Sequence, residues 1–206
     1  MTLRITSVLF LVLLALFIGC AGTQPSRFFT LTPIPEQQIN AEFEDDNHEL
    51  AIGIGPVNFP DYLNRKQIVT RSSHNEIKLS EFDRWAGELK ENTIRILSEN
   101  ISDLLSTDLV FVHPWRGSTK LDYRIEIEVI RFDGDLGGKV VLISRWAVRG
   151  GQDKEVLYIT KSRIEEPVET QGYPALVAAQ SRALANLSYK ISSTIERLSR
   201  AQAVSE

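Results

Sequence analysis

A strict alternation of apolar and charged residues from Tyr123 to Phe132 constrains the fold more than any other stretch of the sequence. The apolar side chains take every second position and the charged ones fill the gaps: Tyr123, Ile125, Ile127 and Val129 against Arg124, Glu126 and Glu128. A period of two is typical of a strand with one buried and one solvated face. Similar patterns over 140–148 and 156–164, after glycine-containing turns, predict an antiparallel meander of three strands.

Two longer segments have the periodicity of amphipathic helices. Ser80, with Asp83 three places on, has the form of a capping box, and apolar residues at helical spacing continue to Leu105. We therefore predict a helix over 80–105. A second helix is predicted from Pro174 to Ala201, because proline suits the first turn of a helix and apolar residues again recur on one face.

Short β-prone runs supply the other strands of the predicted sheet. They cover residues 28–31, 50–57, 67–71, 76–79 and 110–112. Trp85 and Trp146 lie on predicted inward faces, so both are expected in the core. The predicted fold is an α/β fold of the α+β two-layer sandwich type, in which one mixed, largely antiparallel sheet carries two long amphipathic helices on one face. We expect a single domain over residues 28–201 and a frayed tail over 202–206.

The N-terminus has the features of an export signal. Arg4 is followed by eleven apolar residues from Val8 to Ile18, which suits the apolar core of a signal peptide, whereas a membrane-spanning helix needs about 20 residues. The stretch from Phe17 to Cys20 resembles a bacterial lipobox, in which the cysteine sulfur receives a diacylglyceryl group before cleavage. Phe17 stands where leucine is usual. The alternative is an ordinary signal peptide, or a short anchor, with a cysteine there by chance.

Cys20 is the only cysteine of the chain, and its position favours lipidation. We therefore expect a lipoprotein signal peptide over 1–19, a lipidated tether over 20–27 and attachment to a membrane through the N-terminal lipid. A single cysteine also means that no intramolecular disulfide can form. The domain is expected to fold without its lipid, because two helices and the meander supply its core.

No pattern of catalytic or metal-binding residues emerges. His48, His74 and His113 lack metal-ligand spacing, and no Gly-x-Ser-x-Gly elbow occurs. The segment 133–139 ends in Gly-Gly-Lys but lacks other residues that a phosphate-binding loop requires, and its Asp-Gly pair is interpreted as a hairpin turn. A net charge of −4 without a basic tract argues against nucleic acid as the main partner. We therefore expect that the protein is not an enzyme and that it binds no cofactor and no metal.

The order of several segments resembles a known family. Phe59–Arg65, followed by Gln67–Arg71, is similar to the PqiC (YmbA-like) lipoproteins, also called ABC-type transport auxiliary lipoproteins. Further segments fit the same pattern: Phe28–Leu31, Arg84–Ala86, Phe132–Gly134, Leu142–Trp146 and Leu184–Ile191. The family usually has aspartate where this chain has Asn64.

The resemblance implies an α/β sandwich without established catalytic residues. It also implies an auxiliary lipoprotein that works with a periplasmic MCE-domain protein and its inner-membrane partner, in systems thought to move lipids or other hydrophobic molecules across the envelope. Ala21 follows the lipidated cysteine. In lipoprotein sorting, a residue other than aspartate there usually implies the outer membrane, and the family expectation is an anchor on its periplasmic face.

Four residues are candidates for partner binding. Tyr62, Leu63 and Arg65 follow a proline and combine an aromatic and an aliphatic anchor with a cationic donor, a combination that suits recognition. Alternatively, the two apolar side chains plug the edge of the sheet and Arg65 bridges a local carboxylate. Trp115, beside Arg116 in a loop, is either a contact hot spot or a side chain folded back over the core.

Three functions remain open at this stage. The favoured one is a docking subunit of a lipid-transport complex. The second is a carrier that holds lipid in an apolar cavity, and the third is an envelope assembly or stress lipoprotein unrelated to transport. A homo-oligomer is possible, and an exposed strand edge could pair with an extended segment of a partner.

Overall fold

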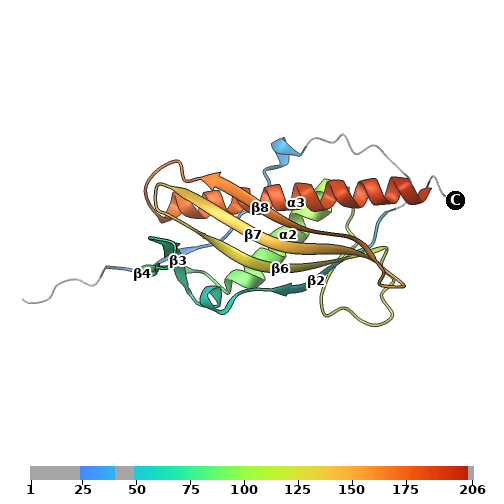
Figure 1. Cartoon of the computed structure of the whole chain (residues 1–206), viewed down its shortest axis with the longest axis horizontal. Coiled ribbons are helices and arrows are strands. Elements are labelled where there is room, and N and C mark those ends of the chain that lie inside the picture. Colours follow the sequence, from blue (N-terminus) through green and yellow to red (C-terminus); the bar gives the residue numbers. More distant parts are fainter. Residues whose placement is uncertain (1–23, 40–48, 204–206) are drawn as a thin grey trace, which may run out of the picture.

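The strands form one eight-stranded mixed sheet, and both long helices pack on the same face of it (Figure 1). The structure is a computed structural model and describes residues 24–39 and 49–203. The predicted signal peptide, the lipid-attachment residue Cys20, the start of the tether and the end of the tail lie outside the described residues. The predicted two-layer α+β architecture is confirmed.

The predicted meander forms the centre and one side of the sheet. Strands β6 (Tyr123–Gly134), β7 (Lys139–Gly150) and β8 (Val156–Pro167) pair antiparallel in sequence order. The predicted hairpin turn at Asp133–Gly134 is wrong, because both residues still pair with β7 as the last two residues of β6. The chain turns at 135–138 instead. Asp133 is thereby fixed on a rigid strand.

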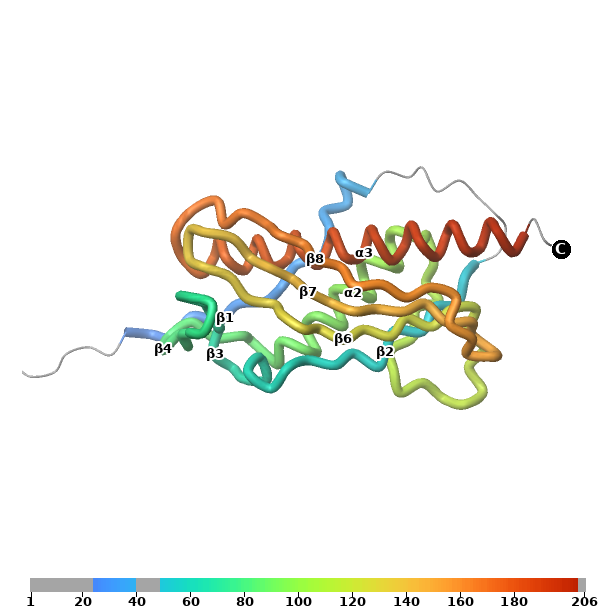
Figure 2. Tube along the Cα trace, viewed as in Figure 1, coloured from blue at the N-terminus to red at the C-terminus, as the bar shows by residue number. Residues whose placement is uncertain are grey.

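The other strands complete the sheet on the far side of β6. Strand β2 (Ile52–Asn58) runs parallel to the first half of β6, and β5 (Val110–Val112) runs parallel to β2. Near the end of β6 lies β3 (Gln67–Arg71), which pairs antiparallel with β4 (Ile77–Trp85). Strand β1 (Arg27–Phe29) runs parallel to β4. Figure 2 shows β1, β3 and β4 gathered at one end of the molecule.

The first long helix, α2, spans Leu89–Leu105, so the predicted start at residue 80 is wrong. The hydrogen bond expected of the capping box does form, since the backbone N–H of Asp83 donates to Ser80 Oγ at 2.9 Å. It closes a bulge in β4, where the register against β3 shifts. Pairing with β3 and β1, both distant in sequence, therefore outweighs the local helical signal.

The second long helix, α3, spans Tyr173–Ala203 and crosses behind β6, β7 and β8. It continues through Gln202, a residue assigned to the frayed tail above, whose Oε1 accepts a hydrogen bond of 2.6 Å from Tyr123 Oη. Helix α2 ends where Ser106 adopts a left-handed conformation, with φ of 49°.

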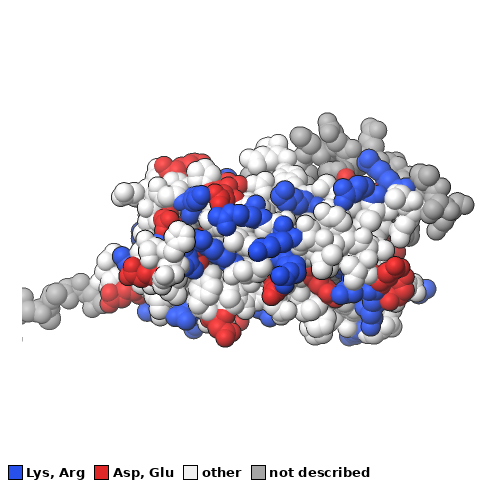
Figure 3. Space-filling view, in the orientation of Figure 1, with Lys and Arg blue, Asp and Glu red and all other residues white. Residues whose placement is uncertain are grey.

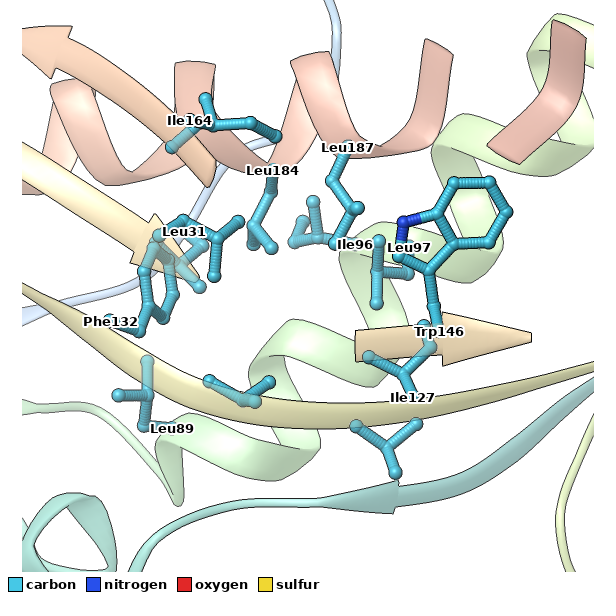
Figure 4. Close-up of a cluster of buried hydrophobic side chains, with 14 of the residues drawn as sticks. Leu31, Leu89, Ile96, Leu97, Ile127, Phe132, Trp146, Ile164, Leu184 and Leu187 are labelled. Atoms are coloured by element: carbon cyan, nitrogen blue, oxygen red, sulfur yellow. The ribbon is translucent and has the colours of Figure 1, made fainter. Parts of the chain in front are cut away.

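Apolar side chains from both helices fill the space against the sheet. Leu184 and Leu187 of α3 lie opposite Phe132 and Trp146 of the sheet, as Figure 4 shows. Trp146 and Trp85 are each 3% exposed, so their predicted place in the core is confirmed, although Trp85 reaches it from a strand. Each fully buried side chain of this size contributes about 1.5–3 kcal/mol to folding.

The segment after β1 is hydrogen-bonded to both helices. The N–H of Thr32 donates to Ser181 Oγ of α3 at 3.2 Å, and the N–H of Ile34 donates to Asn100 Oδ1 of α2 at 2.8 Å. Asn100 Nδ2 in turn donates to Ser188 Oγ at 3.2 Å. The residues that follow the predicted tether are therefore joined to the core of the domain.

Candidate functional site

A buried carboxylate on the outward face of the sheet, away from the helices, organises the candidate site. Asp133 of β6 is fully buried. Its Oδ1 accepts hydrogen bonds from Arg71 Nε at 3.0 Å and from Arg131 Nε at 2.7 Å, and its Oδ2 accepts from Arg71 Nη2 and Tyr62 Oη, each at 2.9 Å. We call these four residues the Asp133 cluster.

Three separate elements bring the cluster together. Tyr62 belongs to η3 (Asp61–Leu63), a 3-10 helix between β2 and β3. Arg71 ends β3, and Arg131 lies two residues before Asp133 on the same face of β6. The turn that contains η3 thus lies over the end of β6, and its tyrosine shields the carboxylate from water.

The charges of the cluster satisfy one another. Burial works to raise the pKa of Asp133, but the hydrogen bonds from Arg71, Tyr62 and Arg131 outweigh it and hold that pKa below its ordinary value. Burial and the negative charge of Asp133 raise the pKa of Tyr62 to about 12. At neutral pH the carboxylate is therefore ionised and the phenol is a hydrogen-bond donor. Both carboxylate oxygens are occupied, which suits a structural role.

The three predicted partner-binding residues around η3 have different surroundings. Leu63 is 3% exposed and belongs to the core, and Tyr62 is half-buried against it. Arg65 is half-buried, and its Nε has no hydrogen-bond partner. The local carboxylate is bridged by Arg71, and Arg65 forms no ion pair with any residue that the structure describes. Partner contact by these three residues stays a prediction.

Trp115 folds back over the outward face of the sheet. A Cβ atom placed on Gly53 of β2 would lie 2.7 Å from Leu121 Cδ1 and 3.1 Å from Trp115 Cζ3, so the glycine lets both side chains lie close against the strand. The indole packs edge-on against His113, with ring centroids 5.2 Å apart, and the Arg124 guanidinium lies 5.6 Å from its centroid. Trp115 is half-buried, and its contact with a partner also stays a prediction.

The structure does not join Trp115 and Arg65 into one site. Trp115 lies beside Arg124 at the start of β6, whereas η3 lies beside Asp133, nine residues further along that strand. At the rise of a strand, nine residues span ~30 Å. Two separate surfaces are therefore candidates for docking.

The Asp133 cluster was not predicted from the sequence. Arg131 and Asp133 lie two residues apart on one strand, a spacing that places both on the same face and could have indicated their ion pair. The contacts with Arg71 and Tyr62 cross 62 and 71 residues of sequence. No local pattern carries that information.

A match to a known protein family covers most of the chain. A model of the ABC-type transport auxiliary lipoprotein component family matches residues 29–192. The chain belongs to this family. Phe59–Arg65, Gln67–Arg71 and Phe132–Gly134, which carry the resemblance in the sequence, all fall within the match and supply Tyr62, Arg71 and Asp133. Three of the segments that carry the resemblance therefore meet in space at the Asp133 cluster.

Solved structures share the fold of this lipoprotein. A protein without an assigned function has a TM-score of 0.66 and 19% identity, over 84% of this chain and 99% of its own. A protein from Xanthomonas campestris has a TM-score of 0.64 and 15% identity, over 80% of this chain and 92% of its own. Among curated proteins, none matches this sequence. Within residues 24–39 and 49–203, no helix combines the length and hydropathy that a bilayer crossing requires.

Proposed function

We propose that this lipoprotein is a non-catalytic docking subunit of an envelope transport system for lipids or other hydrophobic molecules. Its partner is a periplasmic MCE-domain protein, and it binds that partner from an anchor on the periplasmic face of the outer membrane. The observation that carries the proposal is that three segments that carry the family resemblance converge on the Asp133 cluster. The cluster holds its own carboxylate fully bonded and leaves neighbouring side chains for contact.

The η3 turn supports this proposal because it is a rigid platform. Leu63 fixes it in the core and Tyr62 fixes it to Asp133, so little conformational entropy remains to be lost on binding. Arg65 follows directly, half-buried and without an ion pair among the described residues. A guanidinium in this setting gains most from a carboxylate on a partner.

The anchor places the domain at a membrane. Acylation of Cys20, followed by removal of residues 1–19, would attach the chain, and the family is a lipoprotein family. Ala21, in place of aspartate, supports transfer to the outer membrane. The hydrogen bonds from Thr32 and Ile34 to the helices then connect the tether firmly to the domain.

Purification of the tagged lipoprotein from its native cells tests the proposal. After mild cross-linking, the complex is captured from solubilised membranes and the MCE-domain protein of the same cell is measured by mass spectrometry. We expect strong enrichment of that protein over a control with an unrelated tagged outer-membrane lipoprotein. Equal recovery in both samples would contradict the docking role.

A further inference from the structure

The outward face of the meander has a charge opposite to that of the whole chain. On β6, β7 and β8 the outward positions hold seven lysine and arginine side chains against four carboxylates, whereas the chain has a net charge of −4. Figure 3 shows the cationic side chains gathered across the middle of this face. We call its centre the basic face: Ile143, Arg145, Ile159, Lys161 and Arg163.

Two cross-strand rows build the basic face. Arg145 of β7 lies opposite Lys161 of β8, and in the next row Ile143 lies opposite Arg163. Like charges directly opposite each other destabilise a sheet, so the repulsion between Arg145 and Lys161 lowers the stability of the fold when no ligand is bound. An anionic ligand that binds between them would remove that cost.

Two cations of this face, Arg145 and Lys161, remain available to a ligand, whereas Arg163 pairs with Glu165 and Arg131, at its border, is bound to Asp133. Arg145 pairs with Glu128 at 2.6 Å, but both side chains are more than half exposed, so solvent screens the pair and leaves it weak. Lys161 forms no ion pair with any residue that the structure describes. These positions can therefore exchange a screened contact for a phosphate oxygen.

Apolar side chains accompany the cations. Ile159 lies two residues from Lys161 on the same side of β8 and is 61% exposed. An exposed isoleucine on a regular strand, next to lysine and arginine, matches the boundary between phosphate headgroups and acyl chains. A surface that binds its ligand through charge alone would not need an exposed isoleucine at this position.

We infer that the basic face lies against the anionic headgroups of a phospholipid bilayer. The inference rests on the membrane anchorage in the proposed function. Arg27, the first residue of β1, follows Cys20 by seven residues, a length of chain that reaches at most ~25 Å. Lipidation of Cys20 would thus hold the domain within that distance of a bilayer, where anionic lipids attract lysine and arginine.

The two binding surfaces do not compete for the same strands. The basic face is centred on β7 and β8, whereas η3 and Trp115 lie on the β2 and β3 side of β6. When the basic face touches lipid, the two candidate docking surfaces, at η3 and at Trp115, therefore lie beside the region in contact with the bilayer and are not covered by it. The bilayer would set the orientation in which they meet a partner.

The test uses the mature lipoprotein with Ile159→Cys, reconstituted into vesicles. Because the sulfur of Cys20 carries the lipid, the thiol introduced on β8 is the only free one for an environment-sensitive fluorophore. One set of vesicles is phosphatidylcholine, and the other contains about one-third phosphatidylglycerol. We expect a blue shift and a roughly twofold rise in emission on the anionic vesicles only, reversed by about 0.5 M salt.

A paired set of variants separates this face from general charge. In the labelled protein, Arg145→Glu with Lys161→Glu should abolish the emission change. The matched pair Lys90→Glu with Lys190→Glu, at exposed positions of α2 and α3, should retain it. Flotation with neutral vesicles verifies the anchor in every sample, and its loss would overturn the anchorage itself. If the protein floats with the vesicles but its emission is the same on both vesicle types, the anchor is intact and the basic face does not bind anionic lipid. That result is expected if an acidic protein covers the basic face instead.

Discussion

Tyr62 Oη donates a hydrogen bond of 2.9 Å to Asp133 Oδ2, across 71 residues of sequence. This contact holds the turn after β2 against the end of the long central strand. It explains why two segments that carry the family resemblance, far apart in the chain, form one unit in space. The position of Arg65, three residues after Tyr62, follows from it.

The Asp133 cluster should contribute strongly to stability. Asp133→Asn removes a buried charge and leaves Arg71 and Arg131 without their common partner, so we expect the free energy of unfolding to fall by about 3 kcal/mol. Tyr62→Phe removes one hydrogen bond to the same charge and should cost about 1.5 kcal/mol. Urea unfolding of the chain that begins after Cys20 measures both.

Glu128→Gln is the matched control for that measurement. It also removes a carboxylate that pairs with an arginine, but both partners are about half exposed. We expect a change below about 1 kcal/mol. If Asp133→Asn costs no more than Glu128→Gln, the cluster does not hold the η3 turn in place.

Alkaline pH should weaken the same contact. The pKa of Tyr62 is raised to about 12 from an ordinary value of 10.0, so the folded state favours the neutral phenol. The resulting stability is fully present below pH 10 and is lost as pH rises through 12. Unfolding free energies measured at pH 8 and pH 11 should therefore differ less in Tyr62→Phe than in the wild type. An equal loss in both proteins would refute this assignment.

Gly151, directly after β7, packs closely against Leu121, and this packing can be tested by substitution. A Cβ atom there would overlap the carbonyl oxygen of Leu121, which is backbone and cannot turn away. Gly151→Ala should lower the free energy of unfolding by at least about 2 kcal/mol. Gly87→Ala is the control, because its Cβ atom would meet nothing within 4 Å. A similar melting temperature for both variants would contradict the close packing of Gly151 against Leu121.

Lipidation of Cys20 is the prediction that fixes the location of the protein. Cells grown with a clickable fatty acid should label the wild type and leave Cys20→Ser unlabelled. Equal labelling of the two proteins would show that the lipobox resemblance is misleading.

Much of the fold could be predicted because the decisive signals are local. The alternation around Ile125 and Ile127 specifies the inward face of β6, and apolar spacing around Leu187 specifies that of α3. The start of α2 could not be predicted, since Ser80 and Asp83 make the same hydrogen bond in a strand bulge as in a helix cap. Only pairing with distant strands decides between them.

The candidate site was less predictable than the fold. The Phe59–Arg65 segment could be singled out by resemblance, but its sequence does not reveal that Leu63 lies in the core while Arg65 lacks an ion pair among the described residues. That difference arises from the contact between η3 and β6. Asp133, assigned to a turn, became the centre of the site because β6 extends to Gly134.

The docking role is tested most directly by one charge reversal measured in two ways. Arg65→Glu places a negative charge next to the η3 turn, and we expect at least a tenfold loss of affinity for the MCE-domain partner, since reversing an interfacial charge can cost several kcal/mol. The melting temperature should change little, because Arg65 forms no ion pair among the described residues and its Nε has no hydrogen-bond partner to lose. Lys190→Glu on α3 is the control and should bind as the wild type does. Unchanged affinity in Arg65→Glu, or a collapse of its melting temperature, would contradict a docking site at Arg65 and direct the search to Trp115.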